Sequence, residues 1–379
     1  MDAVESKTNK EYILCLNPGS SSLKWALFYS LKHEQAEKSG SVKLNELAST
    51  IVKILNDHNV SLVIIRFVHG GIKYFEPIEI NTEVLVVLEK IKSLAPMHMQ
   101  ASLRCSECVN DTYPNVKQIA VFDTELYRDL PEVSQLYGLP KLLIKKYGIR
   151  RFGFHGFAHA GMLTTYEKIN SSMGINKKRV VTMQLGSGCS MTAFQSGTPV
   201  ETSMGFTPND GLLMSTRSGD LDPGLVTWLQ RQENWTPDET DEWLNEKSGW
   251  CGLSGESTDF STLLKNNNEN TEKAIQLFSY RIRKTLGAYY AILGGLDAIL
   301  LSGGIAEHAI EFCRNLLSDL EHLGITLSSK VISVKKKKLA DAYIPLTSKE
   351  AVTEVWIVQN SEFNMMISAV NQIINSVEK

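Results

Sequence analysis

Residues 13–28, ILCLNPGSSSLKWALF, decide how the chain begins to fold. Ile13–Leu16 is an apolar run typical of a buried strand, and it leads directly into Asn17–Ser22, a turn of small and polar residues. Because apolar residues resume at Leu23, the stretch predicts two strands joined by a tight turn. Backbone N–H groups and hydroxyls in such a turn suit an anionic ligand. An ordinary hairpin turn fits the same residues equally well.

A second stretch repeats this arrangement further along the chain. The apolar segment VVTMQL meets the turn Gly186–Ser190, and MTAF follows it. Two strand–turn–strand units in one chain indicate a duplicated fold. Each half would then offer a phosphate-binding hairpin to a cleft between two domains.

The totals of the sequence limit the class of protein. A chain of 379 residues with 43% hydrophobic and 21% charged residues can build two domains. Its net charge of -3 gives no reason to expect nucleic acid or a membrane surface as partner. No apolar run approaches the ~20 residues of a membrane span, and the polar N-terminus does not resemble a signal peptide. Six cysteines are too few for a disulfide scaffold, so we expect a reduced, cytoplasmic protein.

Three charged or titratable residues stand out against apolar surroundings. Arg66 lies inside the strand predicted over 60–68, where its charge has to be paired or face a polar cleft; an arginine reaching out from an edge strand is the alternative. Asp123 follows the strand predicted over 116–122, a position that often points into the ligand crevice of α/β folds, or it caps a following helix. His155 is framed by glycines and phenylalanines, and a buried core histidine is the alternative to a functional one.

Near the C-terminus a glycine pair marks another candidate site. The short apolar strand at 296–301 is followed by Gly303 and Gly304, which open a helix reaching Leu317. Helix N-termini favour phosphate, so a nucleotide-binding turn is one interpretation and a tight strand-to-helix turn is the other.

Taken together, eight motifs resemble the acetate kinase family in their order along the chain, from Leu14 to about Glu354: LNPGSSSLK, RFVHGG, LAPMH, VFDT, YGIRRFGFHG, TSMGFTP, STRSGDLDP and LSGGIAEH. The resemblance implies an α/β protein with the two-domain acetate and sugar kinase/Hsp70/actin (RNase H-like) fold and a duplicated core. It assigns residues 1–127 plus 351–379, closed by the C-terminal helix, to an N-terminal domain. The resemblance assigns residues 128–350 to a C-terminal domain, where it implies the nucleotide site and the dimer interface.

The resemblance also implies a reaction. A phosphoryl group passes between ATP or ADP and acetate, or another short-chain carboxylate, and an acyl phosphate forms with the help of Mg²⁺ or Mn²⁺. A homodimer is the expected assembly. Two alternatives stay open: pyrophosphate or another nucleotide as phosphoryl partner, and a catalytically impaired relative that binds or regulates.

Motif by motif, the resemblance assigns roles to residues of this chain. Arginine forks suit carboxylate and phosphoryl oxyanions. The catalytic residues are Arg66, Asp123, His155 and Arg217, and the pocket for the acyl group is Val68, Met97, Phe154 and Pro208, with Arg66 holding the carboxylate. The nucleotide and phosphate residues are Asn17, Ser20, Ser22, Lys24, Gln184, Gly186, Ser187, Gly188, Asp259, Gly303, Gly304 and Ile305, and the metal ligands are Asn17 and Glu350.

The chain departs from the family pattern mainly in the nucleotide and metal half. Gln184 and Ser187 stand where the family has His and Asn, and Ser261 stands where an arginine is expected. Lys349 replaces the first of a pair of glutamates, so a positive charge is predicted near a metal site.

Overall fold

The computed structural model describes residues 10–19, 21–32, 35–169, 178–257, 259–266, 268–329 and 343–377. The chain divides into two compact units, residues 1–128 with 361–379 and residues 129–360. Each unit contains one six-stranded sheet with helices packed on it. Within the described ranges no helix is long and apolar enough to cross a membrane.

The sheet of the first unit has the strand order β3-β2-β1-β4-β6-β5. Strands β1, β2 and β3 form an antiparallel meander, β1, β4 and β6 run parallel, and β5 is antiparallel to β6. Parallel strands are covered on both faces, so their sequences are almost continuously apolar, as in β1 and β4. The strands are β1 Tyr12–Pro18, β2 Ser22–Phe28, β3 Lys38–Lys43, β4 Val60–Phe67, β5 Ile78–Glu79 and β6 Lys117–Phe122.

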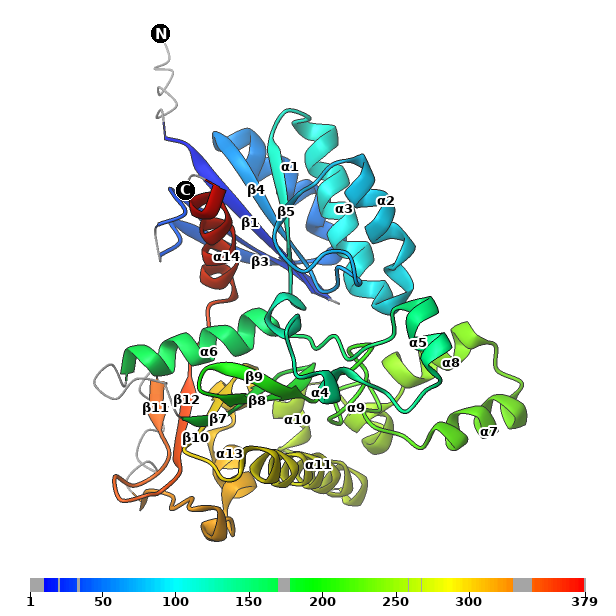
Figure 1. Cartoon of the computed structure of the whole chain (residues 1–379), viewed down its shortest axis with the longest axis vertical. Coiled ribbons are helices and arrows are strands. Elements are labelled where there is room, and N and C mark those ends of the chain that lie inside the picture. The colour runs from blue at the N-terminus through cyan, green and yellow to red at the C-terminus, as the bar shows by residue number, and fades with distance from the viewer. Residues whose placement is uncertain are drawn as a thin grey trace. The chain divides into compact units, whose positions relative to one another are not determined.

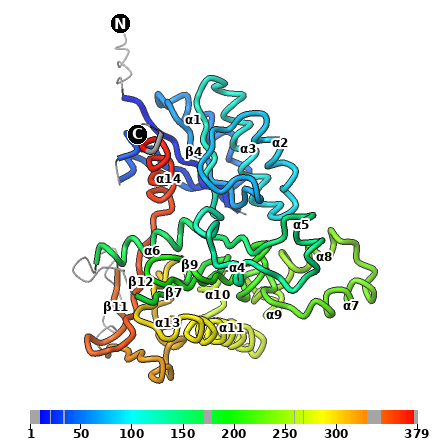
Figure 2. Tube along the Cα trace, viewed as in Figure 1, coloured from blue at the N-terminus to red at the C-terminus, as the bar shows by residue number. Residues whose placement is uncertain are grey.

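Helices lie along both sides of this sheet (Figure 1). Helix α3 packs on β1 and β4 with α1 and α2 beside it, and α14 packs on β1, β4 and β6. The C-terminal helix therefore completes the core of the first unit, as the red segment among the blue strands shows (Figure 2). The helices are α1 Leu47–Asp57, α2 Thr82–Lys90, α3 Pro96–Thr112 and α14 Glu362–Val377.

The sheet of the second unit has the order β11-β12-β10-β7-β8-β9. Again three strands, β7 to β9, form an antiparallel meander, two further strands, β10 and β12, run parallel to β7, and an antiparallel strand, β11, closes the edge. When the strands are followed from the outer strand of the meander to the opposite edge, the two sheets have the same order and the same strand directions. This confirms the predicted duplication. The strands are β7 Arg179–Leu185, β8 Cys189–Gln195, β9 Thr198–Thr202, β10 Ala298–Ser302, β11 Tyr343–Pro345 and β12 Glu354–Val358.

Helices α6 and α11 lie on opposite sides of the second sheet (Figure 1). Helix α6 packs on β7, β10 and β12, and α11 packs on β7 and β8. The helices of this unit are α4 Glu132–Gln135, α5 Lys141–Tyr147, α6 Gly156–Ile169, α7 Pro223–Glu233, α8 Pro237–Glu246, α9 Gly249–Ser254, α10 Phe260–Leu263, α11 Glu269–Leu293, α12 Gly304–His308 and α13 Ile310–Leu317.

The boundary between the units differs from the sequence-based one near the C-terminus. Residues 351–379 were all assigned to the N-terminal domain, but β12 pairs with β10 in the second sheet. Residues 351–360 therefore belong to the second unit, and the first unit resumes at Ser361. The difference arises because the last buried strand and the closing helix follow each other without a break that the sequence reveals.

Candidate active site

A buried ion pair lies where two parallel strands of the first sheet end. Arg66 is near the end of β4 and Asp123 directly follows β6. The Arg66 Nε donates to one carboxylate oxygen of Asp123 at 3.0 Å, and Nη2 donates to the other. Only 7% of Arg66 and 1% of Asp123 is exposed. Because β4 is an interior strand, Arg66 does not reach out from an edge, and Asp123 makes a bidentate pair with it.

Two further side chains extend this pair. Arg66 Nη1 donates to Asn17 Oδ1 at 2.8 Å, and Asn17 Nδ2 donates to the carboxylate of Glu362, the first residue of α14. Burial alone would lower the pKa of Arg66, but the carboxylates of Asp123 and Glu362 outweigh burial and raise it. Arg66 is therefore a buried guanidinium that stays charged, held directly by Asp123 and Asn17, with Glu362 bonded to Asn17 behind them.

Glu362 was missed by the sequence analysis. It lies 345 positions from Asn17, and only the fold brings them together. An available signal was an acidic residue in the first turn of the helix that follows the last buried strand. Glu350, which the sequence analysis predicts as a metal ligand, lies in the second unit, in an exposed turn before β12, next to the exposed Lys349.

The turn between β1 and β2 carries the other predicted residues of the first phosphate loop. The Gly19 N–H donates to the carbonyl of Ser22 at 2.8 Å and closes the turn. Lys24 is exposed and pairs with Asn17 across the two strands. Ser20 lies outside the described residues.

The residues predicted for the acyl pocket come from both units. Val68 is 4% exposed just after β4, whereas Met97 in the first turn of α3 is 43% exposed. In the second unit Phe154 is 1% exposed, and the carbonyl of the half-buried Pro208 accepts a hydrogen bond from Arg217 Nη1 at 3.1 Å.

The second unit places His155 and Arg217 against the turn between β7 and β8. A Cβ on Gly188 would lie 3.3 Å from Cε1 and Nε2 of His155 and 3.6 Å from Nη1 of Arg217. The turn is held by Gly186, whose N–H donates to the Gly188 carbonyl at 3.1 Å. Ser187, at its tip, is exposed. An imidazole and a guanidinium thus meet at one glycine, whose missing side chain leaves the backbone accessible. Burial lowers the pKa of Arg217.

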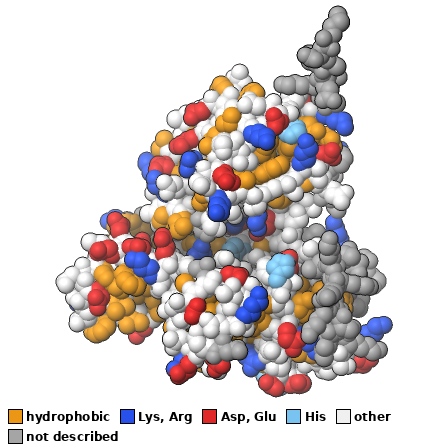
Figure 3. Space-filling view, turned by 180° about the vertical axis from the view of Figure 1, so that it is seen from behind, with side chains coloured by type: hydrophobic (Ala, Val, Ile, Leu, Met, Phe, Trp, Pro, Cys, Tyr) orange, Lys and Arg blue, Asp and Glu red, His pale blue; other side chains and the backbone are white. Residues whose placement is uncertain are grey.

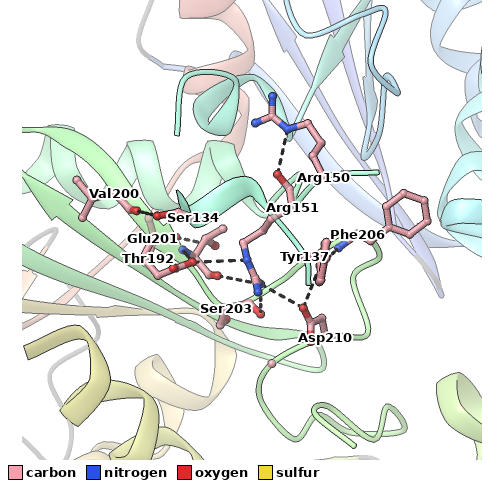
Figure 4. A network of polar contacts seen from close by, with 12 residues as sticks. Ser134, Tyr137, Arg150, Arg151, Thr192, Val200, Glu201, Ser203, Phe206 and Asp210 are labelled. Atoms are coloured by element: carbon pink, nitrogen blue, oxygen red, sulfur yellow. Dashed lines mark hydrogen bonds and ion pairs between the residues drawn. The ribbon is translucent and has the colours of Figure 1, made fainter. Parts of the chain in front are cut away.

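A network around Arg151 holds the loop that follows β9, as the contacts of Tyr137, Arg151, Phe206 and Asp210 show (Figure 4). The same loop carries Pro208 and Arg217. Arg151 Nη1 bonds to Asp210 at 3.1 Å and donates to the carbonyl of Thr202, at the end of β9, at 3.3 Å. In the same loop the Phe206 N–H donates to the hydroxyl of Tyr137 at 2.7 Å. Burial, with the neighbouring Asp220 carboxyl, raises the pKa of Asp210 to about 6. Charged and polar contacts, rather than regular secondary structure, hold this loop in place.

The glycine turn after β10 packs against the end of β7. Gly303 has φ +93°, and a Cβ there would lie 2.5 Å from the carbonyl of Leu185 and 2.7 Å from Nε2 of Gln184, so the position requires glycine. Gln184 pairs with Ser302 between the two strands. Among the described residues, Gln184 Oε1 and Ser302 Oγ are buried without a hydrogen-bond partner. The structure therefore brings both predicted nucleotide turns of this unit together.

Gly304 and Ile305 continue this turn as the first residues of α12. A Cβ on Gly304 would meet nothing within 4 Å, whereas Ile305 is 5% exposed and packs inward. The next residue, Ala306, is fully buried.

Asp259 has a local structural role. Its carboxylate caps α10 and accepts hydrogen bonds from the backbone N–H and the hydroxyl of both Ser261 and Thr262. Hydrogen bonds from these two residues lower the pKa of Asp259 to about 2. Ser261, where the family pattern has an arginine, is thus one of the cap's donors.

Comparisons with known proteins agree with the topology of the two sheets. Residues 30–369 match the model of the acetokinase family. The acetate kinase of Dictyoglomus turgidum is 35% identical over 391 residues, which cover 92% of this chain and 94% of that protein. The crystal structure of Porphyromonas gingivalis acetate kinase has a TM-score of 0.80 at 30% identity and covers 96% of this chain and 100% of its own. A Francisella tularensis propionate kinase has a TM-score of 0.82 at 28% identity, with coverages of 95% and 98%.

The shared fold and the family match over residues 30–369 define the chain as a phosphotransferase that acts on a carboxyl group. The chain belongs to the acetokinase family.

The buried pair gives a prediction about stability. Asp123→Ala leaves the Arg66 charge buried without its bidentate partner, so we expect the free energy of unfolding to fall by about 3–5 kcal/mol. In the double variant Arg66→Met/Asp123→Leu no buried charge remains, and most of this loss should be recovered although activity stays lost. Urea titrations of the three proteins measure the effect. A loss below about 1 kcal/mol in Asp123→Ala, the level of an exposed pair, would contradict the role given to the pair.

Proposed function

We propose that this protein transfers a phosphoryl group between ATP and acetate and forms acetyl phosphate. A carboxylate oxygen of acetate attacks the γ-phosphorus, a new P–O bond forms, and the bond from that phosphorus to the bridging oxygen of ADP breaks. Both reactants are anionic, so the reaction depends on positioning and charge stabilisation. The observation that carries the proposal is the buried guanidinium of Arg66, which Asp123 and Asn17 hold in one orientation.

His155 and Arg217 both bind the phosphoryl group in this proposal. Both lie at Gly188, where the turn offers backbone groups to a phosphate. Arg217 would hold the migrating phosphoryl group with its fork of N–H donors, and His155 would donate to an equatorial oxygen. Gln184 replaces a cationic or neutral imidazole by an amide, which still donates a hydrogen bond but carries no charge.

Mg²⁺ is the metal that we propose, with Asn17 and Glu362 as the residues that hold it. Among the described residues there is no group of three or more His, Cys, Asp or Glu side chains that could bind a metal. The amide oxygen of Asn17 and the carboxylate of Glu362 fit Mg²⁺, which is usually bound through one or two carboxylates together with water and substrate phosphates. The metal would neutralise charge on the phosphates. Glu362 takes the place that the sequence analysis gave to Glu350, because its carboxylate meets Asn17 in the first unit.

A hydroxamate assay for acyl phosphate tests the function directly. Acetate, propionate and butyrate are each combined with ATP, GTP and pyrophosphate, and we expect the highest rate with acetate and ATP. Arg217→Ala should lower kcat by about 100- to 1,000-fold. Arg231→Ala, which changes an exposed arginine of α7, serves as the control and should keep the parental rate. Product with pyrophosphate but not with ATP would contradict the proposed donor, and no product in any combination would contradict the reaction.

The two candidate metal ligands can be separated by one matched pair of variants. Glu362→Gln removes the charge beside Asn17, so the Mg²⁺ concentration for half-maximal activity should rise by about 10- to 100-fold. Glu350→Gln changes an exposed carboxylate and should leave it unchanged. Titrations of activity with Mg²⁺ at saturating ATP measure both. The opposite result, a large effect at Glu350 alone, would restore the assignment made from the sequence.

We also propose that the protein is a homodimer whose second copy covers an apolar surface of the second unit. Figure 3 shows apolar side chains gathered in the region of α7 and α8. Large exposed apolar side chains on helices α4, α5, α7 and α8 and the loop after α4 are Val133, Leu136, Leu139, Leu142, Leu143, Tyr147, Leu225, Trp228 and Trp243. Exposed clusters of this kind are typical of protein interfaces.

Substitutions on this surface test the assembly. Leu142→Glu/Trp228→Glu should convert the protein to a monomer in sedimentation velocity, because two charges would be buried at the interface. Ile72→Glu alters a residue that is 65% exposed in the first unit and should leave the dimer intact. A parental sedimentation coefficient for the double variant would show that another surface mediates assembly.

The six cysteines are all free, which supports a cytoplasmic location as part of the proposal.

A further inference from the structure

The hydroxyl of Ser190 is shared by two histidine rings. Ser190 follows the β7–β8 turn, and its Oγ lies 2.8 Å from Nδ1 of His155 and 2.7 Å from Nε2 of His159. His159 is one helical turn after His155, in α6, and its N–H donates to the His155 carbonyl at 3.0 Å. A chain of polar contacts therefore leads from the candidate catalytic histidine into the core of the second unit.

The chain continues through β7. His159 Nδ1 lies 2.5 Å from the hydroxyl of Thr182, and that hydroxyl donates to the carbonyl of Thr192 at 3.4 Å. Ser190, His159 and Thr182 are each 0% exposed. Burial, followed by the nearby His155 ring, lowers the pKa of His159 well below its ordinary value, so this ring stays neutral.

The donor and acceptor of each contact follow once one proton of the chain is assigned, and we assign the proton of Thr182. A hydroxyl has one proton to donate, and the proton of Thr182 is directed to the Thr192 carbonyl. Thr182 then accepts from Nδ1–H of His159, which leaves Nε2 of that ring as an acceptor. Ser190 donates its only proton to this nitrogen, and so it has to accept from Nδ1–H of His155.

The backbone of His155 is also constrained. Its φ is +57°, in the left-handed region that a residue with a side chain rarely adopts, and α6 begins at the next residue. Such strain persists where the surroundings fix the residue, often at functional sites. With Nδ1 bonded to Ser190, the other edge of the ring, Nε2 and Cε1, lies against Gly188.

We propose that Ser190, His159 and Thr182 are positioning residues that hold His155 by its Nδ1–H and direct its Nε2 to the phosphate turn. The inference rests on the proposed role of His155 in phosphoryl transfer. It has a chemical consequence: because Nδ1 keeps its proton, Nε2 carries a proton only when the ring is an imidazolium. His155 then donates to a phosphoryl oxygen as a cation and places a positive charge at the turn where Gln184 carries none.

Ser190→Ala removes the link between the two rings and little else. We expect kcat to fall by about 10- to 100-fold, as for other residues that orient a catalytic ligand, while KM for ATP and acetate stays within about twofold of the parental value. Ser254→Ala is the matched control, since Ser254 is 6% exposed and lies in the same unit, and its hydroxyl bonds to nearby backbone groups, the carbonyls of Trp250 and Cys251 and the N–H of Glu256. The control should keep the parental kcat.

Two substitutions of His159 distinguish the contributions of its two ring nitrogens. In His159→Gln the amide can reach the position of Nε2 and keep the bond to Ser190, whereas in His159→Asn it reaches only the position of Nδ1 and keeps the bond to Thr182. We expect the Gln variant to retain more activity and the Asn variant to fall to the level of Ser190→Ala. Equal loss in both, in step with a lowered Tm, would mean a purely structural role and overturn the proposal.

A spectroscopic readout tests the tautomer itself. Long-range ¹H–¹⁵N correlation spectra of the histidine rings, assigned by comparison with His155→Ala, should show neutral His155 protonated at Nδ1 in the parent. In Ser190→Ala the signal of an Nε2–H form should appear. Nε2–H in the parent overturns the proposed direction. Parental kcat in Ser190→Ala with inactive His155→Ala overturns the positioning role alone, whereas parental kcat in His155→Ala removes the proposed function of that histidine.

Discussion

The first unit depends on one constraint: a guanidinium buried inside a β-sheet has to be paired. Asp123 meets this need because β4 and β6 are neighbouring parallel strands, so Arg66 and the residue after β6 end at the same edge of the sheet. Asn17, at the end of the adjacent parallel strand β1, joins from the same edge. The ligand-binding edge of an open α/β sheet is formed by the carboxyl ends of its strands. Charge pairing and sheet topology thus select the same place for the site.

Duplication repeats the scaffold but not its chemistry. In the second sheet the strands equivalent to β1 and β4 are β7 and β10, and their carboxyl ends carry Gln184 and Ser302. Both side chains are neutral, and each has a buried oxygen without a partner among the described residues. One copy of the topology therefore holds a permanent cation, while the other offers hydrogen bonds and close backbone approach at Gly303. This division suits a reaction in which two anions have to be bound in different ways.

Much of the fold could be predicted from local patterns. The strands predicted over 60–68, 116–122 and 296–301 correspond to β4, β6 and β10, with ends that differ by one or two residues. Motif order located most of the candidate residues. Glu362 was beyond reach because its partner Asn17 is at the other end of the chain, and spacing says nothing about a helix that returns to the first sheet. The cap at Asp259 was missed for a different reason: a family motif suggested a ligand contact where local hydrogen bonds to Ser261 and Thr262 occupy the carboxylate.

The departures from the family pattern have different structural weight. Lys349 lies in an exposed turn of the second unit. Ser261 serves a helix cap. Gln184 is the departure that changes the chemistry of the turn between β7 and β8, the proposed phosphate site, because an amide replaces a group able to carry charge. If His155 acts as a cation, held by Ser190, a positive charge lies at Gly188 of the same turn without any change in the surrounding strands. The loss at Gln184 is then a redistribution of charge within one turn rather than the loss of a phosphate site.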